Sequence, residues 1–215
     1  MDLKAVLIDL DGTICKFNID YREAHKNSIN YLISIGLKDK NIIQERSLYN
    51  ILKKLKKKFP EKKYKHTKKK LYRCFQEVET EAAHNSSLIE GVSKTIYQLK
   101  AIGLKLAVVT NNCRIATEKT LGKFDLTNIF DTIITRDDIE NLKPDSDSIK
   151  KALFCLNVIP NETIFVGDSI ADMMAANANN IISVGVLTGP TKKEMLLESN
   201  PDYIFNSINN ILEII

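Results

Sequence analysis

The chain lacks any long hydrophobic run. Its first apolar stretch reaches only Ile8 before Asp9 interrupts it, which is too short for the hydrophobic region of a secretory signal peptide. No other stretch approaches the roughly 20 apolar residues that a membrane-spanning helix needs. We therefore expect a cytoplasmic protein that does not associate with a membrane.

Cysteine is also scarce, and the cysteines are not spaced like metal ligands. The four cysteines are widely separated, with no Cys-x-x-Cys pair and no histidine at the spacing of metal ligands: Cys15, Cys74, Cys113 and Cys155. This pattern argues against a zinc site and predicts reduced thiols. The three histidines have no mutual spacing that indicates catalysis, and we expect none of them to be catalytic: His25, His66 and His84.

What the chain does contain is the pattern of an α/β protein. Its 215 residues are 44% hydrophobic and 27% charged, which suits either one α/β domain or a core with a small accessory domain. Short β-branched runs alternate with helical patterns, which predicts a Rossmann-like, doubly wound parallel sheet. Strands are expected near 4–9, 104–110, 131–135, 162–167, 181–187 and, weakly, 203–205. Helices are expected at 92–102, 113–122, 145–157, 169–178, 191–199 and 206–214.

The segment 21–84 differs because it has almost no strand-like run. Three sets of apolar residues recur at helical spacing there, and they predict three helices. The sets are Ile29, Leu32 and Ile33; Leu48, Ile51, Leu52 and Leu55; and Leu71, Cys74, Phe75 and Val78. We expect an all-helical segment at 21–84, inserted into an α/β core made of 1–20 and 85–215.

The most informative motif is Asp9-Leu10-Asp11-Gly12-Thr13, which follows the first apolar run. Side chains alternate along a strand, so Asp9 and Asp11 point to the same side. Two carboxylates this close repel each other unless a cation lies between them or one of them holds a proton. The alternative interpretation is an Asp-Gly turn at the end of a strand.

Three further motifs follow in order along the chain. Thr110 and Asn111 end the apolar run 106–109, Lys143 precedes a proline, and Gly167-Asp168 precedes Asp172 by the spacing G-D-x-x-x-D. The carboxyl ends of parallel strands meet at one edge of a sheet, so Asp9, Thr110 and Asp168 are expected to lie together. Taken singly, only the first and fourth motifs are specific.

Taken together, the four motifs resemble those of the haloacid dehalogenase superfamily of phosphohydrolases. The resemblance implies that Asp9 is a nucleophile that forms an aspartyl phosphate and that Asp11 acts first as general acid and then as general base. Lys143 would neutralise the nucleophile and the phosphoryl group. Thr110 would bind phosphoryl oxygens, and Asn111 and Thr13 would shape the phosphate site.

The resemblance also implies that 21–84 is a helical cap over a catalytic core made of 1–20 and 85–215, and that Mg²⁺ is the cofactor. The ion would lie among the Asp9 side chain, the Asp11 backbone carbonyl and Asp168, with Asp172 holding the outer shell. Each role has a structural alternative. Thr110 is also a residue type that caps helices, Lys143 is also typical of a surface loop, and Asp172 is also typical of a first helical turn.

The expected substrate is a small phosphorylated metabolite, either phosphoglycolate-like or a sugar phosphate. A second acidic residue, Asp11, argues against dehalogenation, because a halide leaving group needs no acid. The sequence 144–147 lacks the second proline that many such family members carry, which weakens the transfer of any named substrate. A phosphomutase of the beta-phosphoglucomutase type remains the enzymatic alternative, and we expect a monomer or a homodimer.

Charge is distributed unevenly. Residues 53–73 carry 12 basic residues and one acidic residue, Glu61, so this Lys-rich tract has a net charge of +11 against +4 for the whole chain. The tract has three interpretations: a solvated helix face, attraction of an anionic substrate, and binding of nucleic acid or an acidic partner. The third would make the chain a non-catalytic binding protein, and the intact set of Asp9, Asp11, Lys143 and Asp168 argues against that alternative. No nucleic-acid-binding motif accompanies the tract, and Tyr64 and Tyr72 are too sparse for a base-stacking platform, so we do not expect nucleic acid as a partner.

Overall fold

A six-stranded parallel sheet forms the centre of the molecule. The computed structural model describes residues 3–215, so the first two residues of the predicted core lie outside the described chain. The strand order is β3-β2-β1-β4-β5-β6, and each neighbouring pair is parallel. The strands are β1 (Ala5–Ile8), β2 (Lys105–Val109), β3 (Thr132–Ile134), β4 (Thr163–Gly167), β5 (Ile182–Val186) and β6 (Tyr203–Phe205). The predicted parallel sheet is confirmed.

Helices cover both faces of this sheet. In β1, Val6 and Ile8 pack into one hydrophobic cluster, while Ala5 and Leu7 pack into a second cluster on the opposite face. A parallel sheet buried on both faces has strands that are apolar at every position, which explains the apolar run before Asp9. The doubly wound arrangement is therefore confirmed. Its helices are α5 (Val92–Ala101), α6 (Arg114–Lys123), α7 (Asp147–Leu156), α8 (Ile170–Asn177) and α9 (Lys193–Glu198), with short 3-10 helices η1 (Thr127–Ile129), η2 (Arg136–Asp138) and η3 (Pro160–Glu162).

The last helix differs from the prediction. Instead of an α-helix over 206–214, the chain forms a 3-10 helix, η4 (Ile208–Glu213). Ile208 and Ile211 are both buried in the cluster shared with α5. A 3-10 helix places residues i and i+3 directly above one another, so it buries both isoleucines on one narrow line.

The segment 21–84 is helical, as expected, but it contains four helices among its described residues and not three. These are α1 (Tyr21–Ser34), α2 (Lys40–Ile43), α3 (Leu48–Lys58) and α4 (Glu61–His84). The additional helix, α2, spans a single turn, too short for its periodicity to be recognised, and the Asp39 side chain caps it by accepting from the Asn41 N–H at 3.0 Å. Ile33, expected on the apolar face of α1, is 50% exposed.

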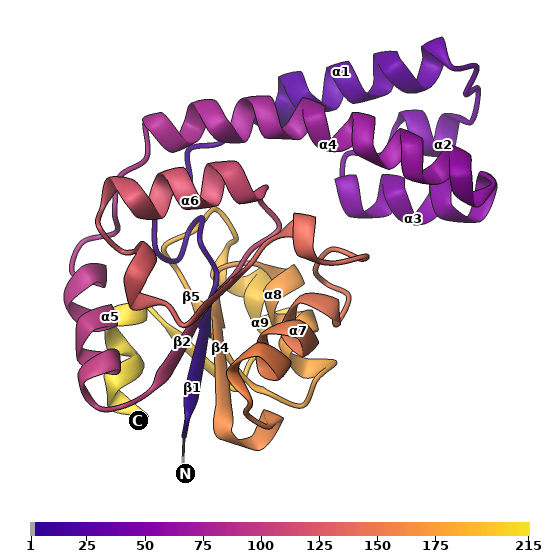
Figure 1. Ribbon diagram of the computed structural model, residues 1–215. Coiled ribbons are helices and arrows are strands. Elements are labelled where there is room, and N and C mark those ends of the chain that lie inside the picture. The colour runs from indigo at the N-terminus through magenta and orange to yellow at the C-terminus, as the bar shows by residue number, and fades with distance from the viewer. Residues whose placement is uncertain (1–2) are drawn as a thin grey trace.

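The helices α1–α4 lie beyond the carboxyl end of β1, at the opposite side of the molecule from both chain ends (Figure 1). They share a hydrophobic cluster of their own, which includes Leu32, Ile51, Leu55 and Leu71. Leu142, from the loop before α7, is buried in the same cluster. The residue immediately before Lys143 is therefore anchored in the helical layer.

No helix within residues 3–215 has both the length and the apolar composition required to cross a lipid bilayer.

Candidate active site

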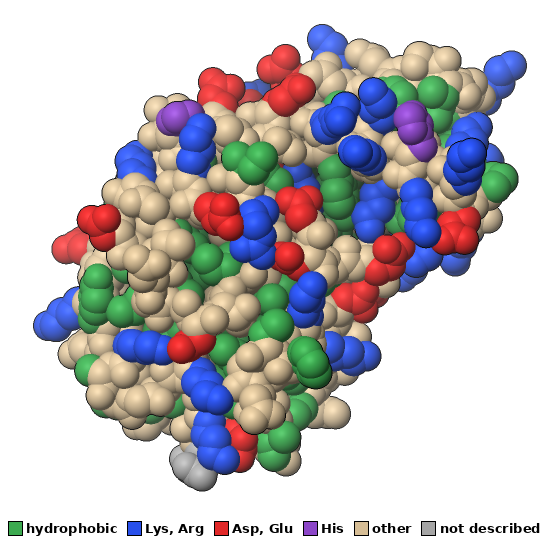
Figure 2. All heavy atoms as spheres, viewed as in Figure 1, with side chains coloured by type: hydrophobic (Ala, Val, Ile, Leu, Met, Phe, Trp, Pro, Cys, Tyr) green, Lys and Arg blue, Asp and Glu red, His purple; other side chains and the backbone are tan. Residues whose placement is uncertain are grey.

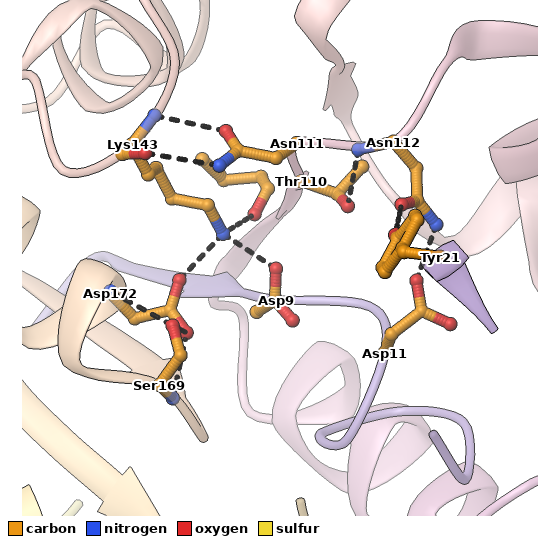
Figure 3. A network of polar contacts seen from close by, with 10 residues as sticks. Asp9, Asp11, Tyr21, Thr110, Asn111, Asn112, Lys143, Ser169 and Asp172 are labelled. Atoms are coloured by element: carbon orange, nitrogen blue, oxygen red, sulfur yellow. Dashed lines mark hydrogen bonds and ion pairs between the residues drawn. The ribbon is translucent and has the colours of Figure 1, made fainter. Parts of the chain in front are cut away.

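Asp9 and Lys143 form a buried ion pair at the carboxyl end of β1. Asp9 is 7% exposed, and its Oδ1 atom lies 2.6 Å from Lys143 Nζ. The same Nζ lies 2.6 Å from Asp172 Oδ1 and donates to the backbone carbonyl of Val109 at 2.8 Å. Figure 3 shows the lysine between the two carboxylates. Lys143 is thus a buried side chain and not a surface-loop residue.

The charges of this pair influence each other strongly. Burial raises the pKa of Asp9 to about 7, and the nearby Asp172 charge adds to the rise while Lys143 opposes it. Burial alone would lower the pKa of Lys143, but the carboxylates of Asp172 and Asp9 outweigh it and hold this pKa above its usual value. The lysine therefore remains charged at neutral pH.

Three buried carboxylates can hold a metal ion here. One oxygen of each of Asp9, Asp168 and Asp172 lies within 4.8 Å of the others. Burial raises the pKa of Asp168 to about 9, and the charges of Asp9 and Asp172 add to the rise. Carboxylate oxygens are the donors that Mg²⁺ prefers, so the residues present fit a hard divalent cation.

Asp172 has partners that suit an outer position around such an ion. Its Oδ1 pairs with Lys143, and its Oδ2 accepts from the Ser169 N–H at 3.0 Å and from the Ser169 hydroxyl at 2.6 Å. Ser169 and Asp172 also form the capping box of α8. The structural interpretation of Asp172 as a first-turn acid is therefore correct, and its place around a metal ion stays a prediction.

Two glycines lie close to the Asp168 side chain. A Cβ at Gly12 would lie 2.5 Å from Asp168 Cγ, and a Cβ at Gly189 would lie 1.8 Å from Asp168 Oδ2. Gly12 also has a φ of +86°, a conformation that residues with a side chain rarely adopt. Both positions thus need glycine for Asp168 to keep its place in the cluster.

Asp11 has different partners from Asp9. Its Oδ2 accepts a hydrogen bond from the Asn112 side-chain amide, and the Tyr21 hydroxyl donates to Asn112 Oδ1 at 3.2 Å (Figure 3). Burial raises the pKa of Asp11 to about 7, and the charge of Asp9 contributes further. A carboxyl group with such a pKa holds or releases a proton near neutral pH, as a general acid or base must.

Asn111, from the second motif, holds the backbone of Lys143 through two hydrogen bonds. The Asn111 amide donates to the Lys143 carbonyl at 3.1 Å, and Asn111 Oδ1 accepts from the Lys143 N–H at 2.9 Å. Thr110 Oγ1 accepts from the Asn112 N–H at 3.1 Å. Thr13, in contrast, is fully buried, and its hydroxyl has no hydrogen-bond partner among the described residues. Its contact with phosphate stays a prediction.

These side chains line a cavity of about 260 Å³. It brings together all the predicted site residues except Thr13, namely Asp9, Asp11, Thr110, Asn111, Lys143, Asp168 and Asp172. Sequence reasoning missed Tyr21, Asn112 and Ser169, which also line it. Asn112 directly follows the second motif, and that position could have indicated it as a site residue. No feature of the sequence indicated Tyr21. Among the described residues, none from the Lys-rich tract lines this cavity.

Comparison with known proteins agrees with this arrangement. Over its whole length the chain is 30% identical to the pyrophosphatase PpaX of Halalkalibacterium halodurans, of which it covers 98%. It is 34% identical to the phosphoglycolate phosphatase of Escherichia coli over 131 residues, which are 61% of this chain and 52% of that enzyme. The crystal structure of a predicted phosphatase from Clostridium acetobutylicum matches with a TM-score of 0.66 and 25% identity, covering 99% of each chain.

The family profile of the haloacid dehalogenase-like hydrolases matches residues 6–186, a range that contains all four motifs. The resemblance read from the motifs is thereby confirmed, and the chain belongs to the haloacid dehalogenase-like hydrolases.

Proposed function

We propose that the protein is a Mg²⁺-dependent phosphatase that hydrolyses a small phosphorylated metabolite through an aspartyl-phosphate intermediate. The observation that carries the proposal is the buried Asp9, held by Lys143 at 2.6 Å in a cavity that also contains Asp11. One carboxylate is thus fixed and paired with a cation, and a second, Asp11, bonds to the neutral Asn112 amide and has a pKa raised to about 7. These are the requirements for a nucleophile and for a separate acid and base.

In the first step, a carboxylate oxygen of Asp9 forms a bond to phosphorus while the bond from phosphorus to the leaving oxygen breaks. Asp11 gives its proton to that leaving oxygen. Lys143 stays charged and stabilises the negative charge on the phosphoryl oxygens, which increases in the transition state. The Thr110 hydroxyl lies at the same edge of the cavity and can donate to one of those oxygens.

In the second step, Asp11 accepts a proton from water as the water oxygen bonds to phosphorus and the bond to Asp9 breaks. Asp9 regains its carboxylate, Asp11 regains its proton, and inorganic phosphate leaves. A Mg²⁺ ion held by Asp9, the Asp11 carbonyl and Asp168, with Asp172 in the outer shell, would neutralise phosphoryl oxygens among these carboxylates. Without such a cation, an anionic substrate would meet four carboxylates and a single lysine in this cavity.

The cavity favours a small substrate. Its volume of about 260 Å³ lies below the roughly 300 to 1,000 Å³ typical of pockets for drug-sized ligands. The relative that matches over the whole chain is named a pyrophosphatase, whereas the phosphoglycolate phosphatase matches over 61% of it. We therefore place inorganic pyrophosphate ahead of phosphoglycolate and sugar phosphates. A phosphomutase would use the same Asp9 chemistry with a substrate hydroxyl in place of water.

We also propose that 21–84 acts as a cap over a core of 1–20 and 85–215. Tyr21, the first residue of α1, and Leu142, beside Lys143, both link the helical layer to the site. A cap of this kind excludes water from the reacting phosphoryl group. The proposal includes a cytoplasmic location and no nucleic-acid partner.

The test is a panel of pyrophosphate, phosphoglycolate and sugar phosphates, with and without Mg²⁺, on the wild type and on Asp9→Asn. We expect wild-type turnover only with Mg²⁺, and a loss of at least about a thousandfold in Asp9→Asn because the nucleophile is removed. Asp125→Asn is the matched control, since Asp125 is exposed and lies outside the cavity. Retained activity in Asp9→Asn, or full activity in excess chelator, would contradict the mechanism.

A further inference from the structure

Asp11 is connected to the helical layer by a chain of two hydrogen bonds. The Tyr21 hydroxyl donates to Asn112 Oδ1 at 3.2 Å, and Asn112 Nδ2 donates to Asp11 Oδ2 (Figure 3). Tyr21 is the first residue of α1, Asn112 follows β2, and Asp11 follows β1. The start of α1 is therefore joined to the Asp11 carboxyl group through Asn112, which lies about 100 residues further along the chain.

One orientation of the Asn112 amide satisfies both contacts. A tyrosine hydroxyl that donates must face the carbonyl oxygen of the Asn112 amide, which turns the amide nitrogen toward Asp11. The amide N–H₂ group can only donate, so it favours a bare Oδ2 and disfavours a proton on that atom. The proton that Asp11 carries is thereby directed to Oδ1.

The Asn112 loop is held from a second side by α4. Glu79 accepts from the Cys113 N–H at 3.0 Å, and Glu79 is itself paired with the buried Arg136. Tyr21 is also fixed by its ring, whose centroid lies 5.5 Å from that of Phe75 in α4. The Asn112 amide therefore has little freedom to rotate while α1 and α4 are packed against the core.

We propose that Asn112, oriented by Tyr21, is a positioning residue that keeps the transferable proton of Asp11 on Oδ1. The inference rests on the proposed role of Asp11 as general acid. It deepens that role by naming the proton-bearing atom and by linking its placement to the helical layer. Removal of Asn112 leaves the proton free to occupy either oxygen, and the carboxyl group free to rotate.

The test compares first-turnover rates for phenyl phosphate and 4-nitrophenyl phosphate in the presence of Mg²⁺. Phenolate needs protonation as it leaves, whereas 4-nitrophenolate needs much less, so only the first substrate reports strongly on the acid. In Asn112→Ala we expect the first turnover of phenyl phosphate to slow by about tenfold to a hundredfold, and that of 4-nitrophenyl phosphate by less than about threefold. We expect KM to change little for either substrate.

Tyr21→Phe provides a milder variant that keeps the ring packing. Loss of one neutral hydrogen bond predicts a slowing of about twofold to tenfold for phenyl phosphate. Because Tyr21 acts through Asn112, the double variant should be no slower than Asn112→Ala alone. Similarly, Asn112→Ala should add little when Asp11 is already replaced by Asn.

Two matched controls remove the same groups elsewhere. Tyr97→Phe deletes a hydroxyl from a side chain that is 51% exposed, and Asn128→Ala deletes an exposed amide. Both should retain wild-type rates with both substrates. Circular dichroism checks that each variant is folded. If Asn112→Ala does not fold, Tyr21→Phe still tests the proposal.

Three outcomes decide between the possibilities. Equal slowing of both aryl phosphates, or additive effects in the double variants, overturns the positioning role while leaving the phosphatase intact. A first-turnover burst that survives in Asp9→Asn overturns the proposed function itself. Selective slowing with non-additive doubles supports both.

Discussion

Lys143 shows, at the scale of one residue, that the buried charges of this site are not balanced. It lies within 2.6 Å of both Asp9 and Asp172, yet two further carboxylates, Asp11 and Asp168, share the cavity. Burial is the main cause of the raised pKa values of Asp9, Asp11 and Asp168, and the excess of neighbouring carboxylate charge, which one lysine does not offset, adds to the rise. The cavity is therefore poised for a divalent cation.

This excess predicts an unusual pH dependence of stability without metal. An aspartate in an unfolded chain titrates near pH 4, but the folded pKa is about 7 for Asp9 and Asp11 and about 9 for Asp168. Between these values the folded protein holds more protons than the unfolded chain, so the free energy of unfolding falls as pH rises. We expect Tm in excess chelator to drop by at least about 4 °C from pH 5 to pH 8.

Added Mg²⁺ should raise Tm more at pH 8 than at pH 5, because it competes with protons for the same oxygens. Asp168→Asn should flatten the slope in chelator, whereas Asp125→Asn should leave it unchanged. A Tm that rises with pH in chelator would show that these carboxylates are not desolvated as the structure indicates.

Gly189 lies against the Asp168 side chain, and replacing it gives a second prediction for a single residue. Because a Cβ there would meet Asp168 Oδ2 at 1.8 Å, Gly189→Ala should displace Asp168 and weaken Mg²⁺ binding by about tenfold to a hundredfold, with a parallel loss of activity. Isothermal titration with Mg²⁺ measures the effect. In Gly122→Ala, the matched control within α6, the added Cβ would meet nothing closer than 3.9 Å, so Mg²⁺ affinity should stay unchanged.

The sequence was sufficient to predict the residues whose positions follow from strand ends. Asp9, Thr110 and Asp168 each come directly after or near the end of a strand, so a parallel sheet alone brings them to one edge. Tyr21 and Gly189 could not be found in this way. Their places depend on how α1 and the chain after β5 fold back over that edge, which no local pattern encodes.

At the scale of elements, the contact between α4 and the core depends on one buried ion pair. Glu79 and Arg136 are each 1% exposed, and the Arg136 guanidinium also donates to the Tyr72 carbonyl at 3.0 Å. Burial raises the pKa of Glu79, while Arg136 opposes that rise. This pair connects a helix of the 21–84 segment to the chain just after β3.

Breaking one side of this pair should be costly. Arg136→Met alone leaves Glu79 buried without its counter-ion, and we expect a loss of about 3 to 5 kcal/mol in the free energy of unfolding, measured with urea. The double variant Glu79→Leu with Arg136→Met should recover most of that loss, since two apolar side chains then pack together. Glu118→Gln, in the partly exposed pair with Arg114, is the control and should change stability by less than about 1 kcal/mol. A double variant as unstable as the single one would contradict this account.

The elements themselves were predicted to different degrees. The six strands were found because apolar β-branched runs are short and bounded, and the boundaries agree within two residues. The single-turn α2 and the 3-10 form of η4 were missed. Both depend on local details, a cap at Asp39 and the burial of Ile208 with Ile211, that periodicity over longer windows does not resolve.

For the whole molecule, the main asymmetry is the charge of the Lys-rich tract. Figure 2 shows Lys and Arg side chains gathered over the region of α3 and α4. Several of them pair with acids, as Lys54 does with Glu45 and Lys58 with Asp39. Seven others make no ion pair within the described residues, namely Lys53, Lys57, Lys62, Lys63, Lys69, Lys70 and Arg73. Lys53 and Lys63 lie over the rings of Tyr49 and Phe59. Of the remaining side chains, four are lysines: Lys57, Lys62, Lys69 and Lys70.

Replacing these four lysines by Gln distinguishes the three interpretations of the tract. None of them lines the cavity, and at physiological salt the Debye length is about 8 Å, so we expect kcat and kcat/KM to match the wild type. The matched control replaces four dispersed, exposed lysines, Lys16, Lys94, Lys150 and Lys193, and removes the same total charge.

The salt dependence of the two variants then decides what the tract does. Steering of an anionic substrate would lower kcat/KM of the tract variant alone, only at low salt and with kcat preserved, because steering acts on the encounter. Binding of nucleic acid would appear as an affinity of the wild type that falls steeply with salt and is lost in the tract variant but kept in the control. Equal kinetics in both variants, with no nucleic-acid binding at low salt, is the result we expect, because a lysine-rich helix face that does not line the cavity interacts chiefly with water.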